Sequence, residues 1–259
     1  GGCLRTGSES DPLVVGRRSG SSADDGGGVM SELMEFDLSR VSVRELNRYL
    51  HADLPGSRVD RVRISNPNGL HSLAVGLDCE VEIEIAGHAG YFIAGMNKFA
   101  KVTVEGNVGW SVGENMMSGE VIVRGHASES AGASARGGLL VIDGDASSRC
   151  GISLKGGRVV VAGDVGHFSA FMAQAGTMVV CGNAGANLGD SLYEAVLYVG
   201  GAIDSLGADA REEPLEASDV ELLKGLLGEA GVEANAENFR RVASSRSLYH
   251  WNSEAHQEY

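Results

Sequence analysis

The chain has 259 residues, of which 43% are hydrophobic and 22% charged, as in a globular protein that buries a sizeable core. Its formal net charge of −14 argues against nucleic acid or an anionic membrane surface as a partner, because Lys and Arg supply most of the affinity for both. No apolar run approaches the roughly 18 residues of a membrane span, and its 4 cysteines, without metal-type spacing or a secretory signal, fit a cytoplasmic protein.

The N-terminal region is rich in glycine and serine and shows no periodicity. Residues 1–33 are therefore expected to be a disordered leader or upstream translation, with Met30 or Met34 as the natural start. Cys3 raises the idea of a lipid anchor, but no hydrophobic stretch precedes it.

Residues 34–80 are predicted to form an N-terminal cap with one helix and one strand. The helix signal runs over 38–50, where Ser42 and Glu45 make a capping box. Residues 59–64 then alternate between apolar and polar, which is typical of a strand.

A 19-residue repeat covers residues 81–210. The glycines that mark it stand 19 residues apart: Gly87, Gly106, Gly125, Gly144, Gly163, Gly182 and Gly201. This register indicates a solenoid in which each repeat is one coil.

The columns around these glycines indicate strands. The positions four and two residues before each glycine are apolar, as in Val102 and Val104, so one face of a strand points inward. Seven residues after the glycine only Gly or Ala occurs through Ala208, which indicates a corner that has no room for a side chain or needs positive φ. We therefore predict an all-β fold, a right-handed parallel β-helix of about seven 19-residue coils with short flanking α-helices. A left-handed hexapeptide β-helix is excluded, because it would repeat at about 18 residues and not at 19.

Residues 211–259 are predicted to be a C-terminal helical segment. After Pro214, Ser218 and Glu221 make a second capping box, and leucines follow in a helical stripe at Leu222, Leu223, Leu226 and Leu227. A further helix is expected from Asn238 to Ser244. Such helices would cover an open end or face of the solenoid.

One column that should face outward becomes apolar along the solenoid. Three residues before each glycine, Glu84 and Thr103 are polar, and the following coils carry Ile122, Val141, Val160, Val179 and Tyr198. Strands that are apolar on both faces are covered on both. The cover is either the chain's own leucine helix or a partner subunit, and the sequence leaves both open.

A polar column directly follows the glycines: His88, Asn107, His126, Asp145, Asp164 and Asn183. The favoured interpretation is a turn ladder whose side chains bond to local backbone. The alternative is a metal shared by His126, Asp145 and Asp164.

No complete catalytic site is visible in the sequence. Cys150 lies in an inward column and is expected to be a buried thiol, whereas Cys181 points outward, and neither has a base beside it. No phosphate loop, nucleophile elbow, HExxH motif or iron–sulphur cysteine run occurs. We therefore assign no catalytic, cofactor-binding or metal-binding residue to this chain.

Three segments resemble the GXGXG-repeat family: 148–157, 166–174 and 187–195. That family includes the C-terminal β-helix domain of the glutamate synthase large subunit and the β-helix subunit of formylmethanofuran dehydrogenase. The likeness extends over roughly residues 60–210. With the segments 239–244 and 248–251, the chain looks most like the stand-alone β-helix subunit of the N-methylglutamate synthase group.

The resemblance implies a non-catalytic subunit of an enzyme complex that makes N-methylglutamate and ammonia from methylamine and glutamate. The expected partners are an amidotransferase-like chain and a synthase chain, and FMN and an iron–sulphur cluster are expected on the synthase chain. The alternative is a β-helix subunit of a formylmethanofuran dehydrogenase or formyltransferase-type complex. An independent carbohydrate-active β-helix is disfavoured, because aromatic residues are only 5% and no outward acidic cluster repeats.

Overall fold

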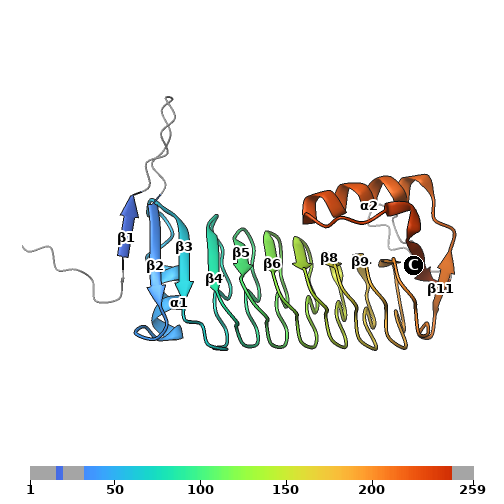
Figure 1. Ribbon diagram of the computed structural model, residues 1–259, viewed down its shortest axis with the longest axis horizontal. Coiled ribbons are helices and arrows are strands. Elements are labelled where there is room, and N and C mark those ends of the chain that lie inside the picture. The colour runs from blue at the N-terminus through green and yellow to red at the C-terminus, as the bar shows by residue number, and fades with distance from the viewer. Residues whose placement is uncertain (1–15, 20–31, 247–259) are drawn as a thin grey trace, which may run out of the picture.

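The computed structural model describes residues 16–19 and 32–246. They form a parallel β-helix, visible in Figure 1 as a row of stacked coils, with α1 at the N-terminal end and α2 over the C-terminal half. One sheet of 12 strands runs along the rod in the order β1-β2-β3-β4-β5-β6-β7-β8-β9-β10-β12-β11. The predicted all-β, parallel β-helical fold is confirmed. Among the described residues, no helix is long and apolar enough to cross a membrane.

Most of the sheet is parallel, with one strand from each coil. The parallel strands are β2 (Glu32–Asp37), β3 (Val59–Ser65), β4 (Glu82–Ala86), β5 (Lys101–Val104), β6 (Glu120–Val123), β7 (Leu139–Ile142), β8 (Lys155–Val161), β9 (Ala175–Val180) and β10 (Val196–Val199). From β4 to β10, paired residues are 19 apart in sequence, except at the register shift where Lys155 pairs with Ala175. Val104 lies against Val123 and Val123 against Ile142, all three fully buried, so the inward columns form one continuous wall.

The parallel stack extends before residue 81, into the segment 34–80 that we expected to be a cap. Ile64 of β3 pairs with Ile85, which is 21 residues later, so the period is longer in this coil and the repeat is hidden in the sequence. Strand β1 (Gly16–Ser19) pairs antiparallel with β2. Residues 32 and 33 of the predicted leader begin β2, and its remaining residues, 1–15 and 20–31 with Cys3 and Met30, lie outside the described residues.

Helix α1 (Val43–Ala52) closes the N-terminal end of the core. Its predicted capping box is confirmed: the Glu45 N–H donates to Ser42 Oγ (3.2 Å) and the Ser42 N–H donates to Glu45 Oε2 (2.9 Å). Leu46 and Leu50 are buried in the core that the coils share. The side chain of Asn47 also donates to the Ser72 carbonyl at 2.7 Å, which ties the helix to the first coils.

The repeated glycines stand where successive coils touch. A Cβ atom at Gly144 would lie 2.8 Å from the Gly125 carbonyl oxygen and 2.7 Å from His126 Nδ1. The Gly144 N–H also donates to the Gly125 carbonyl (3.0 Å), so the coils cannot move apart to make room without losing that bond. Only glycine fits this column.

The predicted corner seven residues after the glycine is confirmed on six coils, whereas after Gly201 the positive φ falls on Asp209 (68°) and not on Ala208. The φ angles there lie between 51° and 68° at Ala94, Gly113, Gly132, Gly151, Ala170 and Gly189. The positions five and nine residues after the glycine are also left-handed, as at Ser111 and Asn115, which the pattern of residue types does not predict. In this arm of each coil, every second residue therefore has a left-handed backbone conformation. A non-glycine residue adopts that conformation at a cost in free energy.

The C-terminal segment differs from the prediction in two respects. Helix α2 (Ala217–Ala230) has Glu216 as its N-cap, and the Asp219 carboxylate accepts the Glu216 N–H at 2.8 Å, so the predicted box of Ser218 and Glu221 is wrong. Asp219 lies three residues after the cap, where its carboxylate can reach the backbone, whereas the predicted box would begin inside the helix.

The predicted helix from Asn238 to Ser244 is also wrong, because β12 (Arg240–Ser244) is a strand that follows the short turn η1 (Ala236–Asn238). Strand β12 is antiparallel to β10 and to β11 (Ala210–Glu213), with Val242 opposite Leu197 and fully buried. It covers the edge of β10, which would otherwise be open, and this tertiary pairing decides its conformation.

Helix α2 covers the apolar outer column, here called the apolar stripe: Ile122, Val141, Val160, Val179 and Tyr198. Leu223, Leu226 and Leu227 pack against it, so the chain's own helix is the cover. Arg158 forms a two-point ion pair with Glu229 at one end of the helix.

At the other end of α2, the Tyr198 hydroxyl donates to Asp219 Oδ1 at 2.6 Å. Burial by itself raises the pKa of Asp219, but the hydrogen bonds from Tyr198 and Glu216 and the charge of Arg241 outweigh burial and lower it. Asp219 is therefore a charged acceptor under the start of the helix, where a negative charge is also favoured by the helix dipole.

A glycine-to-alanine pair tests the close contact of the coils. We expect Gly144→Ala to lower the free energy of unfolding by about 1–3 kcal/mol, because the new methyl group overlaps Gly125 and His126. Gly225→Ala is the matched control, since Gly225 lies in α2 with nothing within 4 Å of an added Cβ; it should be neutral or stabilising by up to about 1 kcal/mol. Urea denaturation measures both, and equal effects would contradict the stacking constraint.

Candidate functional site

The polar column after the glycines joins neighbouring coils by hydrogen bonds. Each backbone N–H in the column donates to the side chain one coil earlier, at 2.6–2.9 Å. We call this set the polar ladder; its acceptors are His88, Asn107, His126, Asp145, Asp164 and Asn183. The acceptor atom of each lies over the glycine of the next coil, where a Cβ would block it. The turn-ladder interpretation is confirmed.

The side chains of the alternative metal site act as hydrogen-bond acceptors in the polar ladder. Asp145 Oδ1 accepts the Asp164 N–H, and His126 Nδ1 accepts the Asp145 N–H, each at 2.9 Å. Within residues 16–19 and 32–246, no group of three His, Cys, Asp or Glu side chains is placed to hold a metal ion.

The described thiols lie on different coils, and burial raises the pKa of each. Cys150 is fully buried in its predicted inward column, and burial raises the pKa of its thiol to about 12. Cys181 packs against the layer beneath α2, where burial raises its pKa to about 11. Both thiols stay protonated near neutral pH, and a thiol in that form is a poor nucleophile and a poor metal ligand. Cys3 lies outside the described residues.

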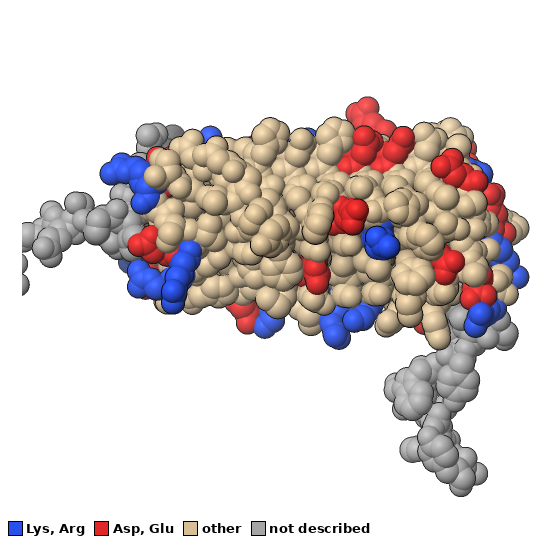
Figure 2. Space-filling model, turned by 90° about the horizontal axis from the view of Figure 1, so that it is seen from below, with Lys and Arg blue, Asp and Glu red and all other residues tan. Residues whose placement is uncertain are grey.

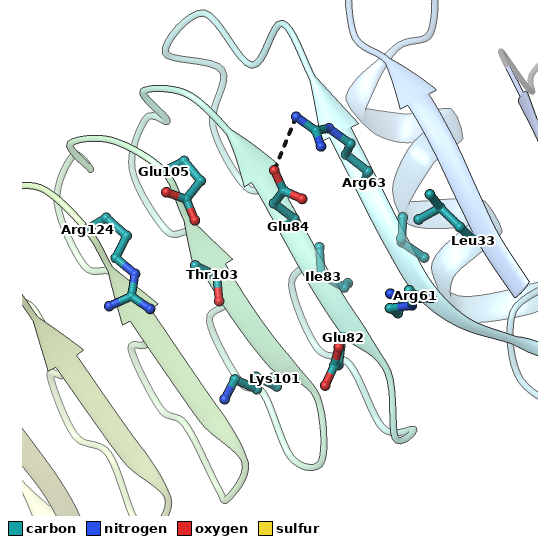
Figure 3. Close-up of a pocket in the computed structure, with 11 residues that line it drawn as sticks. Leu33, Arg61, Arg63, Glu82, Ile83, Glu84, Lys101, Thr103, Glu105 and Arg124 are labelled. Atoms are coloured by element: carbon teal, nitrogen blue, oxygen red, sulfur yellow. Dashed lines mark ion pairs between the residues drawn. The ribbon is translucent and has the colours of Figure 1, made fainter. Parts of the chain in front are cut away.

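A charged hollow of about 470 Å³ lies on the outer face of the sheet, in the part that α2 leaves open. We call it the charged trough. It is lined mainly by side chains of β3, β4 and β5, and Figure 3 shows them standing on neighbouring strands: Arg61, Arg63, Glu82, Glu84, Lys101, Thr103, Glu105 and Arg124.

Charges of opposite sign alternate across the strands of the charged trough. Arg61, Glu82 and Lys101 occupy the same position on β3, β4 and β5. Ion pairs join Arg63 to Glu84 (3.3 Å) and, at the border with β6, Lys101 to Glu120 (2.8 Å). Opposite charges across a sheet stabilise the pairing of its strands, and an exposed pair is worth about 1 kcal/mol or less.

The chemistry that the charged trough supports is recognition of a charged surface. Arg63 and Glu84, which line it, form an ion pair, and their side chains are 48% and 40% exposed. Sequence reasoning did not single it out, because Arg61 and Arg63 precede the regular repeat. The 19-residue register does place Glu82, Lys101 and Glu120 in one column, and that alternation of sign was the available signal.

The charged side chains are unevenly spread over the rod. Figure 2 shows one face whose N-terminal half carries few charged side chains apart from a group at its end, whereas acidic and basic side chains are scattered over the middle and the C-terminal half.

Comparisons with known proteins give matches that extend over the β-helix and the segments on either side of it. The family model described as "GXGXG motif" matches residues 57–257. Protein GlxC of Rhizobium meliloti (strain 1021) is 50% identical to this chain over 218 residues. The aligned region spans 84% of this chain and 96% of that relative.

Substitutions at Asp145 distinguish a hydrogen-bonded ladder from a metal site. Asp145→Ala removes the acceptor of the Asp164 N–H and should lower the free energy of unfolding by about 0.5–1 kcal/mol, whereas Asp145→Asn keeps an acceptor oxygen and should cost less. Both variants remove the same charge, so the difference isolates the hydrogen bond. Thermal unfolding with and without Zn²⁺ measures them. A Zn²⁺-dependent rise in the wild-type midpoint that Asp145→Ala abolishes would instead establish the metal site.

Proposed function

The chain belongs to the GXGXG-motif family, and from this premise we propose that it is a non-catalytic, scaffolding subunit of a glutamate synthase-like multi-subunit complex. The observation that carries the proposal is the family match, which extends over nearly all of the described coils and beyond them. The relative GlxC is covered almost completely by the same alignment, so it too consists mainly of this region.

The interactions of the described residues support a structural role. The polar ladder uses its histidine and aspartate side chains to bond coil to coil, and the protonated thiols are buried or half-buried. Opposite charges in the charged trough pair with each other. These groups maintain the shape and surface of the rod.

More specifically, we propose a complex of the N-methylglutamate synthase type, on the sequence resemblance given above. Its reaction would convert methylamine and glutamate to N-methylglutamate and ammonia. An amidotransferase-like chain and a synthase chain would be the partners. The β-helix would hold these two chains at a fixed separation, since about seven coils at about 4.8 Å each make a stiff rod of roughly 30 Å.

The iron–sulphur cluster implied by this resemblance fits a partner better than this chain. An iron–sulphur cluster needs several thiolates that converge on one point. Cys79, Cys150 and Cys181 are on different coils, and the pKa of each thiol is raised, chiefly by burial. The described residues therefore do not suit a cluster, and we derive no step through one.

Co-expression with the products of neighbouring genes tests this function. We expect the chain to purify with an FMN-containing protein, which flavin fluorescence detects and mass spectrometry identifies, and the complex to form N-methylglutamate from methylamine and glutamate. Removal of this chain should disperse the other two subunits. Purification with a metal-dependent hydrolase and activity on pterin-linked formyl groups would support the formylmethanofuran-type alternative. A chain that purifies alone under these conditions would contradict both.

A further inference from the structure

Aromatic side chains occupy one position on three consecutive coils near the N-terminal end: His71, Tyr91 and Trp110. The backbone sets this register, because the Ser72 N–H donates to the Tyr91 carbonyl (2.9 Å) and the Phe92 N–H donates to the Trp110 carbonyl (2.7 Å). Tyr91 is 49% exposed and Trp110 is 62% exposed. We call these three residues the aromatic column.

Part of the aromatic column is held in place within the chain. The rings of His71 and Tyr91 are stacked, with centroids 3.8 Å apart and planes 20° apart, and His71 Nδ1 accepts the Tyr91 N–H at 3.2 Å. Gly90 leaves the room for this, since a Cβ there would lie 1.9 Å from His71 Nδ1. Rings that are already ordered lose little side-chain entropy when a partner binds.

A carboxylate continues the column. Glu129 occupies the same position on the coil after Trp110, because the Ser111 N–H donates to the Glu129 carbonyl at 2.9 Å. Within the part of the chain that the structure describes, no ion pair or hydrogen bond engages the Glu129 carboxylate. Coils are about 4.8 Å apart, so one cation could contact both the Trp110 ring and this carboxylate. Arginine suits such a place, since its guanidinium stacks on aromatic faces and pairs with carboxylates.

We propose that the aromatic column and Glu129 form the docking site for a partner subunit of the complex, which places an arginine across Trp110 and Glu129 and apolar side chains against Tyr91. This inference rests on the function proposed above. Exposed Trp and Tyr side chains are the residue types that contribute most to protein interfaces. A second copy of this chain is a poor occupant, because two chains of formal net charge −14 repel each other.

Binding of the purified full-length chain to the co-expressed amidotransferase-like and FMN-containing subunits tests the docking site. Trp110→Ser should weaken the affinity for one of these subunits at least about tenfold. Glu129→Gln should weaken it less and should make the affinity less dependent on salt, because it removes one ion pair. Tyr193→Ser is the matched control, a 57% exposed aromatic near the opposite end of the rod, and it should bind as the wild type does. Thermal midpoints equal to that of the wild type show that the variants fold.

The outcomes separate this inference from the proposed function. If the wild-type chain binds neither subunit, the proposed function fails and the docking site fails with it. If the wild type binds and Trp110→Ser binds equally well, only the docking site is wrong. Light scattering of the isolated chain that shows a dimer, lost in Trp110→Ser, would identify a second copy as the occupant and would also overturn the proposal.

Discussion

Contact between glycines on successive coils sets the spacing and register of this protein. A side chain at these positions would collide with the backbone of the coil before, and the glycine backbones bond directly to one another, as from Gly163 to Gly144 at 3.1 Å. The polar ladder depends on the same closeness, because a side chain such as Asp145 must cross over Gly163 to reach the Asp164 N–H. Once this column is fixed, the apolar columns fall into register and fill the interior.

In such a rod, other elements must cover the two ends and the apolar part of the outer face. The N-terminal end of the core is closed by α1, and the edge of β10 is paired by β12. The outer face is divided: α2 covers the apolar stripe, and the remaining part carries the charged trough. The two parts of the outer face thus differ in chemistry, since one is apolar and covered by a helix and the other is charged and not covered by α2. This division suits a subunit that holds partners and leaves the chemistry to them.

Much of the fold could be predicted from the sequence because the repeat is strict. The period alone placed Val104, Val123 and Ile142 on successive layers and identified the polar ladder. The prediction failed where tertiary contacts override the local pattern, as in 238–244, which pairs with β10 as a strand. The prediction also missed the coil that precedes the regular repeat, because the paired residues Ile64 and Ile85 are 21 residues apart there. The position of His71 was hidden for the same reason, whereas Tyr91 and Trp110 stand in the 19-residue register, four residues after Gly87 and Gly106.

Hydrogen exchange of the backbone amides in the polar ladder tests the central constraint most directly. These amides lie at exposed turns and are bonded only to side chains of the neighbouring coil, as Asp145 is to His126. We predict that the amides of Asn107, His126, Asp145 and Asp164 exchange about as slowly as those of the adjoining strands. Exchange of these amides at the rate of an unstructured peptide, with the strands still protected, would show that the ladder does not hold the coils together.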